Sequence, residues 1–250
     1  ILIDIDTDGD EDLIVAARLD DRIHIFENQS DSSKIAFREL GEGSGELTSV
    51  DGVSQPHFIL PADINMDGNL DLVVANSGAN QVVWFENLGS LNFAFGGVIA
   101  ESNEEVEMVN PSTLEAIDLS SAENQGDPFA CHDIIIGFEG GILLAQHTGK
   151  GTYQTKRIAK SSSTCRAIKA IDLDIDKKYI DIVYLTSQSP VPYYIRQKRF
   201  NDFEEPEPFF NYEKYQRNTA RQFELTTASS LEVYTVEADP WDLNSQPIPY

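Results

Sequence analysis

The sequence has few basic residues, little cysteine and no long apolar run. Its 250 residues hold 18 lysines and arginines against 42 aspartates and glutamates, which gives a net charge of −24. Nucleic acids and anionic membrane surfaces are bound by clustered basic side chains, so this balance argues against both partners. No apolar run reaches the roughly 18 residues that cross a bilayer, and we expect no direct membrane insertion. The apolar share of 41% is nevertheless enough for a folded core.

Only two cysteines are present, Cys131 and Cys165. They are too few for a disulfide scaffold, and their spacing does not fit a metal site. A disulfide between them and two buried free thiols are both consistent with the sequence. The disulfide requires an oxidising compartment.

An acidic segment recurs along the chain every 54 to 59 residues. The first copy runs from Asp4 to Leu13 and the second from Asp63 to Leu72, and eroded copies lie at 118–136 and 172–183. Each copy is followed by short β-type runs, such as Ile23–Asn28 and Val82–Asn87, which are separated by glycine, asparagine and serine turns. Four short strands per unit without long helical periodicity are typical of a β-propeller blade.

The repeated unit also resembles a known family. Asp-x-Asp-x-Asp-Gly-x-x-Asp-Leu, followed by an apolar strand and by Phe-Glu-Asn, is similar to the FG-GAP/VCBS repeat, whose calcium-loop blades also occur at the head of integrin α chains. The resemblance is strong from Ile1 to about Gly97, moderate over Glu115–Phe203 and weak beyond. It implies a propeller, typically of seven blades, in which the acidic loop joins the first two strands of each blade.

We therefore predict an all-β fold, namely a β-propeller or an arc of one with four recognisable blades and part of a fifth. The approximate blades are 1–55, 56–111, 112–164 and 165–213, with a partial or closing blade at 214–250. The proline- and acid-rich stretch Glu204–Pro208 predicts a loop or linker. Four blades are fewer than the resemblance implies, so we expect the chain to be part of a longer one.

The spacing of the acidic residues suits a hard cation that prefers oxygen ligands. Side chains at loop positions 1, 3, 5 and 9 converge on one point, the carbonyl at position 7 adds a ligand, and glycine at position 6 allows the sharp reversal. The candidate Ca²⁺ ligands in the first two copies are Asp4, Asp6, Asp8, Asp10 and Asp12, and Asp63, Asn65, Asp67, Asn69 and Asp71. Asp10 and Asn69 would contribute their carbonyl oxygens. An EF-hand would need a glutamate at position 12 and flanking helices, which neither copy has. The alternative is a turn whose side chains cap backbone groups and face water.

The two eroded copies give different expectations. The fourth copy is a third candidate calcium site, with Asp172, Asp174, Asp176 and Asp181 as ligands. Its Lys177 and Lys178 stand where glycine and its neighbour belong, so an ammonium group could replace the ion. The third copy lacks its third and fifth ligands, and we expect no ion there. A disulfide between Cys131 and Cys165 would hold this loop against the next blade and partly replace calcium.

No catalytic constellation is visible in the sequence. None of the four histidines has zinc-site spacing, and no nucleophile elbow or phosphate-binding glycine loop occurs. Five aromatic residues at strand positions favour a core between blades over a sugar-stacking platform: Trp84, Phe85, Phe93, Phe95 and Tyr194.

The leading functional hypothesis is a calcium-stabilised module for interaction, adhesion or assembly with other subunits, extracellular or at the cell surface, with a protein or glycan ligand. The alternative is the propeller portion of a secreted polysaccharide-degrading enzyme, a lyase or a hydrolase.

Overall fold

The computed structural model describes residues 1–40, 47, 52–103, 106–117, 133–149, 151–173, 179–189, 191–199 and 202–209. They form β-strands and two short 3₁₀ helices. Within these ranges, no helix has both the length and the apolar character that a membrane span requires. The predicted partial blade at 214–250 lies outside them.

The first two units are four-stranded antiparallel sheets whose strands follow chain order. Unit 1 contains β1 (Leu2–Ile3), β2 (Asp12–Ala17), β3 (Arg22–Asn28) and β4 (Phe37–Glu39). Unit 2 contains β5 (Pro56–Ala62), β6 (Asp71–Asn76), β7 (Gln81–Asn87) and β8 (Phe93–Glu101). Helix η1 (Arg18–Asp20) and helix η3 (Ser77–Ala79) occupy the same place, between the second and third strands. The strands therefore fall where the repeat predicts them.

Six of the remaining strands are joined into one sheet, and a separate hairpin lies between its last two strands in the chain. The sheet contains β9 (Val109–Ile117), β10 (Asp133–Gly149), β11 (Thr152–Ile171), β12 (Asp181–Thr186), β13 (Tyr193–Ile195) and β16 (Glu207–Pro208). The hairpin is β14 (Gln197–Arg199) with β15 (Asp202–Phe203).

Strand β10 folds back on itself. Its 17 residues would span about 55 Å if they were fully extended. Yet the His147 backbone N–H, near one end, donates to Asp133 Oδ1 at the other end over 2.8 Å. The chain reverses at Gly140 and Gly141, whose φ angles of 121° and 147° favour glycine. Unit 3 therefore consists of β9, the two halves of β10 and the first half of β11.

Unit 4 begins with the second half of β11, which pairs with β12. Strand β13 follows, and β16 forms the outer edge by pairing with Tyr193 and Tyr194. The prediction of a loop throughout Glu204–Pro208 was therefore wrong at its end. An edge strand tolerates a proline because its outward side needs no N–H donor.

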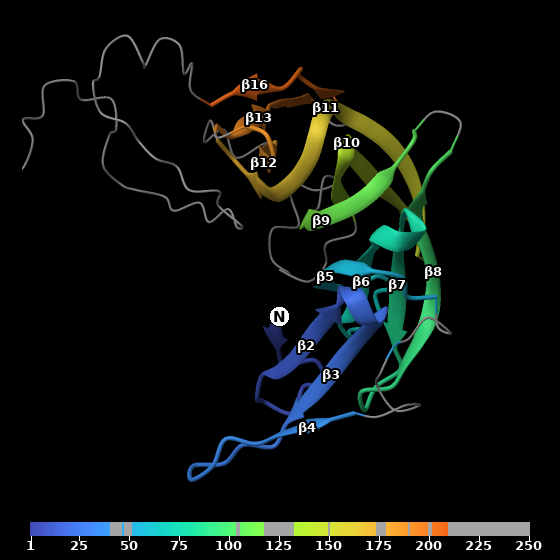
Figure 1. The fold of residues 1–250 in the computed structure, drawn as a ribbon, viewed down its shortest axis with the longest axis vertical. Helices are drawn as coiled ribbons and strands as arrows, with labels where there is room; N and C mark the ends of the chain where they lie inside the picture. Colours follow the sequence, from blue (N-terminus) through green and yellow to red (C-terminus); the bar gives the residue numbers. More distant parts are fainter. Residues whose placement is uncertain are drawn as a thin grey trace, which may run out of the picture.

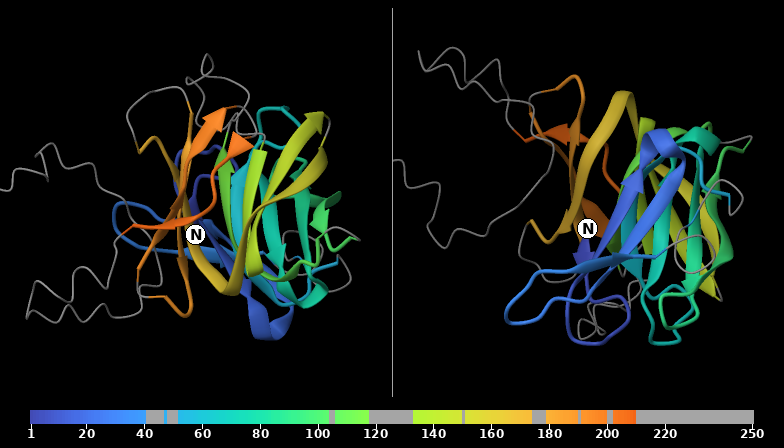
Figure 2. Two further views of the ribbon diagram at one scale, coloured as in Figure 1. Left: turned by 90° about the horizontal axis from the view of Figure 1, so that it is seen from above. Right: turned by 60° about the horizontal axis from the view of Figure 1, so that its bottom comes forward.

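The four units follow one another along an arc (Figure 1), and two further views show their sheets side by side (Figure 2). Three apolar clusters fill the spaces between consecutive units. Strand β6 is buried along its whole length: Leu72 and Val74 face unit 1, whereas Val73 and Ala75 face unit 3. In unit 1, Ile14 faces unit 2, while Val15 on the opposite face is 37% exposed. Alternation along each strand thus determines which side chains lie between blades.

Candidate functional site

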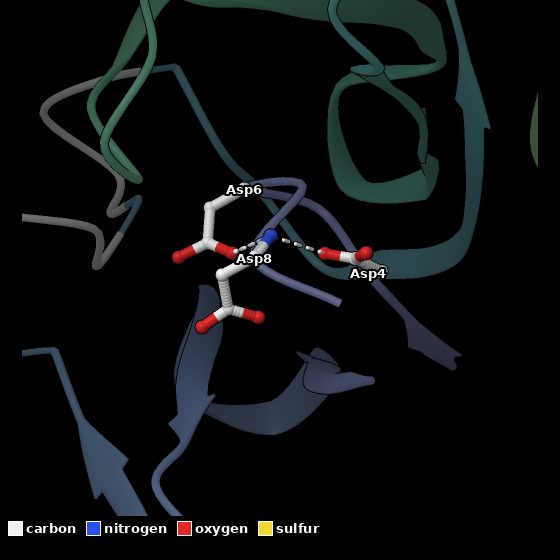
Figure 3. A group of neighbouring side chains, drawn as sticks. All are labelled: Asp4, Asp6 and Asp8. Atoms are coloured by element: carbon white, nitrogen blue, oxygen red, sulfur yellow. Dashed lines mark hydrogen bonds between the residues drawn. The ribbon is translucent and has the colours of Figure 1, made fainter. Parts of the chain in front are cut away.

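The first acidic loop lies between β1 and β2 and brings three carboxylates together (Figure 3). Asp4, Asp6 and Asp8 each offer an oxygen within 4.8 Å of the others. The Asp8 backbone N–H donates to Asp4 Oδ1 (3.1 Å) and to Asp6 Oδ1 (3.2 Å). The Gly9 N–H donates to Asp4 Oδ2 over 3.1 Å, and the Asp10 N–H donates to Asp8 Oδ1 over 3.1 Å. The backbone thus wraps around the carboxylates and fixes their positions.

The second loop, between β5 and β6, repeats this geometry. The Asp67 N–H donates to Asp63 Oδ1 and to Asn65 Oδ1, both over 3.1 Å. The Gly68 N–H reaches Asp63 Oδ2 over 2.9 Å, and the Asn69 N–H reaches Asp67 Oδ1 over 2.8 Å. The glycine has positive φ in both loops, 104° in the first and 91° in the second, as the predicted sharp reversal requires.

The carboxylates of the first loop disfavour one another's ionisation. Burial and the charges of Asp12 and Asp8 raise the pKa of Asp6. Partial burial and the charges of Asp8, Asp6 and Asp4 raise the pKa of Asp10. Asp10 Oδ1 is closed to solvent and has no hydrogen-bond partner. The sequence assigned only the carbonyl of Asp10 to the site, and its enclosed side-chain oxygen is not part of the group formed by Asp4, Asp6 and Asp8.

The last aspartate of each acidic loop connects the loop to the third strand. Asp12 Oδ1 accepts the Asn28 N–H over 2.9 Å, and its Oδ2 accepts the Ile5 N–H over 3.3 Å. Asp71 accepts the equivalent N–H groups of Asn87 and Ile64, over 2.8 and 2.9 Å. Burial raises the pKa of Asp71 to about 6, although these two hydrogen bonds oppose the shift. Both aspartates therefore already have a structural role at the position predicted for a ligand.

The same connection persists in the eroded copies. Asp133 Oδ1 accepts the His147 N–H in unit 3. In unit 4, Asp181 Oδ1 accepts the Gln197 N–H over 2.9 Å, and its Oδ2 accepts the Leu173 N–H over 3.2 Å. These two aspartates are buried like their counterparts in units 1 and 2. This part of the repeat is therefore retained even where the remaining ligand pattern is eroded.

Sequence reasoning missed the role of the Phe-Glu-Asn segment that ends the third strand. Asn28 Nδ2 donates to the Glu11 carbonyl over 3.0 Å, next to Asp12. Asn87 Nδ2 donates to the equivalent Leu70 carbonyl (3.0 Å) and, across the boundary between units, to the Ile5 carbonyl (3.1 Å). The sequence signal for this role was that the Phe-Glu-Asn segment recurs in both units.

The glutamate of the same segment also reaches a loop. Glu86 Oε1 accepts a hydrogen bond from Asn65 Nδ2 over 2.9 Å, which places a carboxylate beside the second loop. The counterpart in unit 1 is Glu27, whose charge contributes to raising the pKa of Asp10. Each loop therefore has an acidic neighbour on the third strand.

Other predicted residues are described only in part. In the fourth copy, Asp174 and Asp176 lie outside the described residues, so calcium binding there stays a prediction. Cys131 also lies outside them. Cys165 is buried, its Sγ donates weakly to the Ala167 carbonyl over 3.6 Å, and burial raises the pKa of its thiol to about 12. Pairing of the two cysteines stays a prediction.

The units, their chain order and their stacking define a β-propeller, as two solved structures also indicate. Both are crystal structures of BBS1N in complex with ARL6DN, soaked with lead or with mercury, and each superposes with a TM-score of 0.50. The lead-soaked structure is 14% identical and covers 82% of this chain, and the mercury-soaked structure is 16% identical and covers 83%. The chain spans only 55% and 56% of the lengths of those chains.

A family model identifies the repeat itself. Residues 4–74 match the FG-GAP-like repeat, which confirms the resemblance over both acidic loops. No curated protein sequence matches the chain significantly.

Proposed function

We propose that the chain is a calcium-stabilised β-propeller module that binds a protein partner outside the cell or at its surface, in adhesion or assembly. The observation that carries the calcium assignment is the duplicated loop geometry. Two segments that are 59 residues apart hold oxygen ligands with the same backbone hydrogen bonds.

The donor set of the first loop fits a hard divalent cation. Every side chain that converges there is a carboxylate, and calcium is bound by six to eight oxygens. Asp4, Asp6 and Asp8 would hold the ion, and Asp10 would add its carbonyl oxygen. A bound cation would favour the ionised forms of Asp6 and Asp10, whose pKa values are raised in its absence. It would thereby connect the first two strands of the unit.

The second loop has the same fit with two fewer charges, because Asn65 and Asn69 stand where the first loop has Asp6 and Asp10. Asn65 replaces an aspartate and still presents its amide oxygen to the Asp67 N–H. Asparagine oxygens are ordinary calcium ligands. Two or three calcium ions would offset only a small part of the net charge of −24. The surface would therefore stay strongly acidic after the ions bind. Such a surface suits a protein in the millimolar calcium outside cells, which supports an extracellular location.

The binding role rests on the architecture. Propellers assembled from repeats expose broad surfaces while their cores lie between the blades. The two solved neighbours are, by their descriptions, complexes with a protein partner. We therefore favour a protein ligand over a glycan.

The proposal can be tested on the wild-type chain and on a variant with one substitution in each loop, Asp8→Asn with Asp67→Asn. Both are attached to beads and exposed to surface-biotinylated cells of the source organism, with calcium or with EGTA, and in parallel to a glycan array. We expect a biotinylated protein to bind the wild type only in calcium and to bind the double variant poorly. Binding to glycans alone, equal binding in EGTA, or cleavage of a polysaccharide would contradict the proposal.

A further inference from the structure

The outer edge of unit 2 has no strand partner among the residues that the structure describes. Strand β8 ends the sheet β5-β6-β7-β8, and it pairs with β7 from Phe93 to Glu101. Within the described part of the chain, no other backbone hydrogen bond reaches residues 94–101. Along its outward side, β8 therefore presents a row of backbone N–H and C=O groups that are available to another strand.

The outer strands of the other three units carry features that prevent strand addition. Strand β4 has three residues, of which Arg38 and Glu39 are charged. Strand β16 has two, a glutamate and a proline. The outer half of β11 carries Lys156, Arg157 and Lys160. Charges, prolines and short length are the usual protection of edge strands.

Strand β8 lacks the charges, the proline and the short length that protect these edges, although its register against β7 shifts at two points, between Val82 and Val83 and between Trp84 and Phe85. Its nine residues contain no proline, and their single charged side chain, Glu101, is at the end. The glycines Gly96 and Gly97 in this strand are explained by packing, because a Cβ at Gly96 would lie 2.4 Å from the Trp84 indole. The contrast with the other edges therefore rests on the missing charges and not on the glycines.

Exposed apolar side chains lie along the same edge. Phe95 is 52% exposed and Val98 is 40% exposed. They are opposite Phe85 and Val83 of β7, which belong to the buried cluster between units 1 and 2. Directly opposed residues share a face of the sheet, so Phe95 and Val98 extend this apolar face to the open edge. The sequence placed Phe95 in the core between blades, and its exposure is a departure from that prediction.

We propose that the outward edge of β8 accepts an extended segment of a partner protein, which adds a fifth strand to unit 2. The segment would place alternating apolar side chains against Phe95 and Val98, as in other cases of strand addition. Its flanks would be basic, because the chain carries −24 and attracts positive charge. The same charge opposes a second copy of this chain as the occupant. This inference rests on the proposed role as a protein-binding module and names the surface and the kind of partner.

The test uses a synthetic probe peptide, KKVTVTVKK, and a control peptide with every valine and threonine N-methylated, whose five central residues cannot donate main-chain hydrogen bonds. Binding is followed by fluorescence anisotropy, and protection of the β8 amides by hydrogen exchange with mass spectrometry. Val98→Lys adds the missing edge charge. Phe37→Lys is the matched control, because Phe37 is 42% exposed on the outer strand of unit 1.

We expect the probe to protect residues 94–101 and to bind Val98→Lys at least about tenfold more weakly than the wild type, with Phe37→Lys unchanged. Equal binding of the N-methylated peptide, equal binding to Val98→Lys, or no binding at millimolar probe would overturn the inference. So would dimers of the free chain that Val98→Lys abolishes, since the occupant would then be a second copy. The calcium-dependent rise in melting temperature, measured on the same samples, tests the proposed function separately.

Discussion

Replacing Asp8 by asparagine should separate the calcium contribution to stability from the hydrogen bonds of the loop. The asparagine Oδ1 can still accept the Asp10 N–H, a contact of 3.1 Å in the wild type. Asn65 shows that an amide serves in this way in the second loop. The substitution therefore removes one negative charge and keeps the turn.

The expected effect follows from mass action. A loop with a Kd of about 0.1 mM, typical of extracellular calcium modules, stabilises the fold by about 2.7 kcal/mol at about 10 mM calcium. If the lost charge weakens binding about 100-fold, nearly all of this stabilisation disappears. For a chain of this size, the melting temperature in calcium should fall by about 5–10 °C. In EGTA it should stay the same or rise slightly, because Asp8 no longer repels Asp4 and Asp6.

Thermal unfolding can be followed through the fluorescence of Trp84, which is 5% exposed. The matched control is Asp31→Asn, which removes an exposed aspartate outside the acidic loops. Asp31 Oδ1 accepts the Ser33 and Lys34 N–H groups. The control should therefore lose similar, small amounts of stability in calcium and in EGTA. A loss for Asp8→Asn that is the same in EGTA as in calcium would refute the reasoning.

Three further predictions concern the packing and titration of units 2 and 3. In EGTA, the free energy of unfolding should decrease as the pH rises from about 4 to about 6. Asp71 has a pKa of about 6 in the folded state and 3.8 in the unfolded state, so the folded state binds more protons in this window. Denaturant titrations at several pH values should show this decrease and a smaller slope in calcium. Gly151→Ala should destabilise the fold by about 1–3 kcal/mol, because its Cβ would lie 2.8 Å from the Trp84 indole. The control Gly149→Ala, whose Cβ would have no atom within 4 Å, should show only the cost of its positive φ. Melting temperatures of the two variants check this. Asn87→Ala should cost about 1–3 kcal/mol in urea unfolding because it leaves the Ile5 and Leu70 carbonyls without this donor, and a loss below about 0.5 kcal/mol would contradict the role given to this side chain.

The sequence predicted the parts of the fold that depend on local spacing. The strands of units 1 and 2 follow from the repeated apolar runs, and the carboxylates of Asp4, Asp6 and Asp8 converge because a tight turn leaves them no other arrangement. The reversal at Gly9 was predictable for the same reason. In each case, residues fewer than about ten positions apart determine the outcome.

Features that depend on distant residues were not predictable. The hydrogen bond from Asn87 to Ile5 joins residues 82 positions apart, and it exists only because units 1 and 2 pack face to face. The exposure of Phe95 depends on which strand is outermost, and strand order is not a property of the local pattern.

The most direct test of the calcium assignment is a crystal structure of the chain grown in calcium, with anomalous scattering used to locate the ions. We expect one ion in each of the first two loops, with oxygens of Asp4, Asp6 and Asp8, and of Asp63, Asn65 and Asp67, about 2.3–2.6 Å away. Loops without anomalous peaks in millimolar calcium, with their carboxylates bound only to backbone N–H groups, would contradict the account.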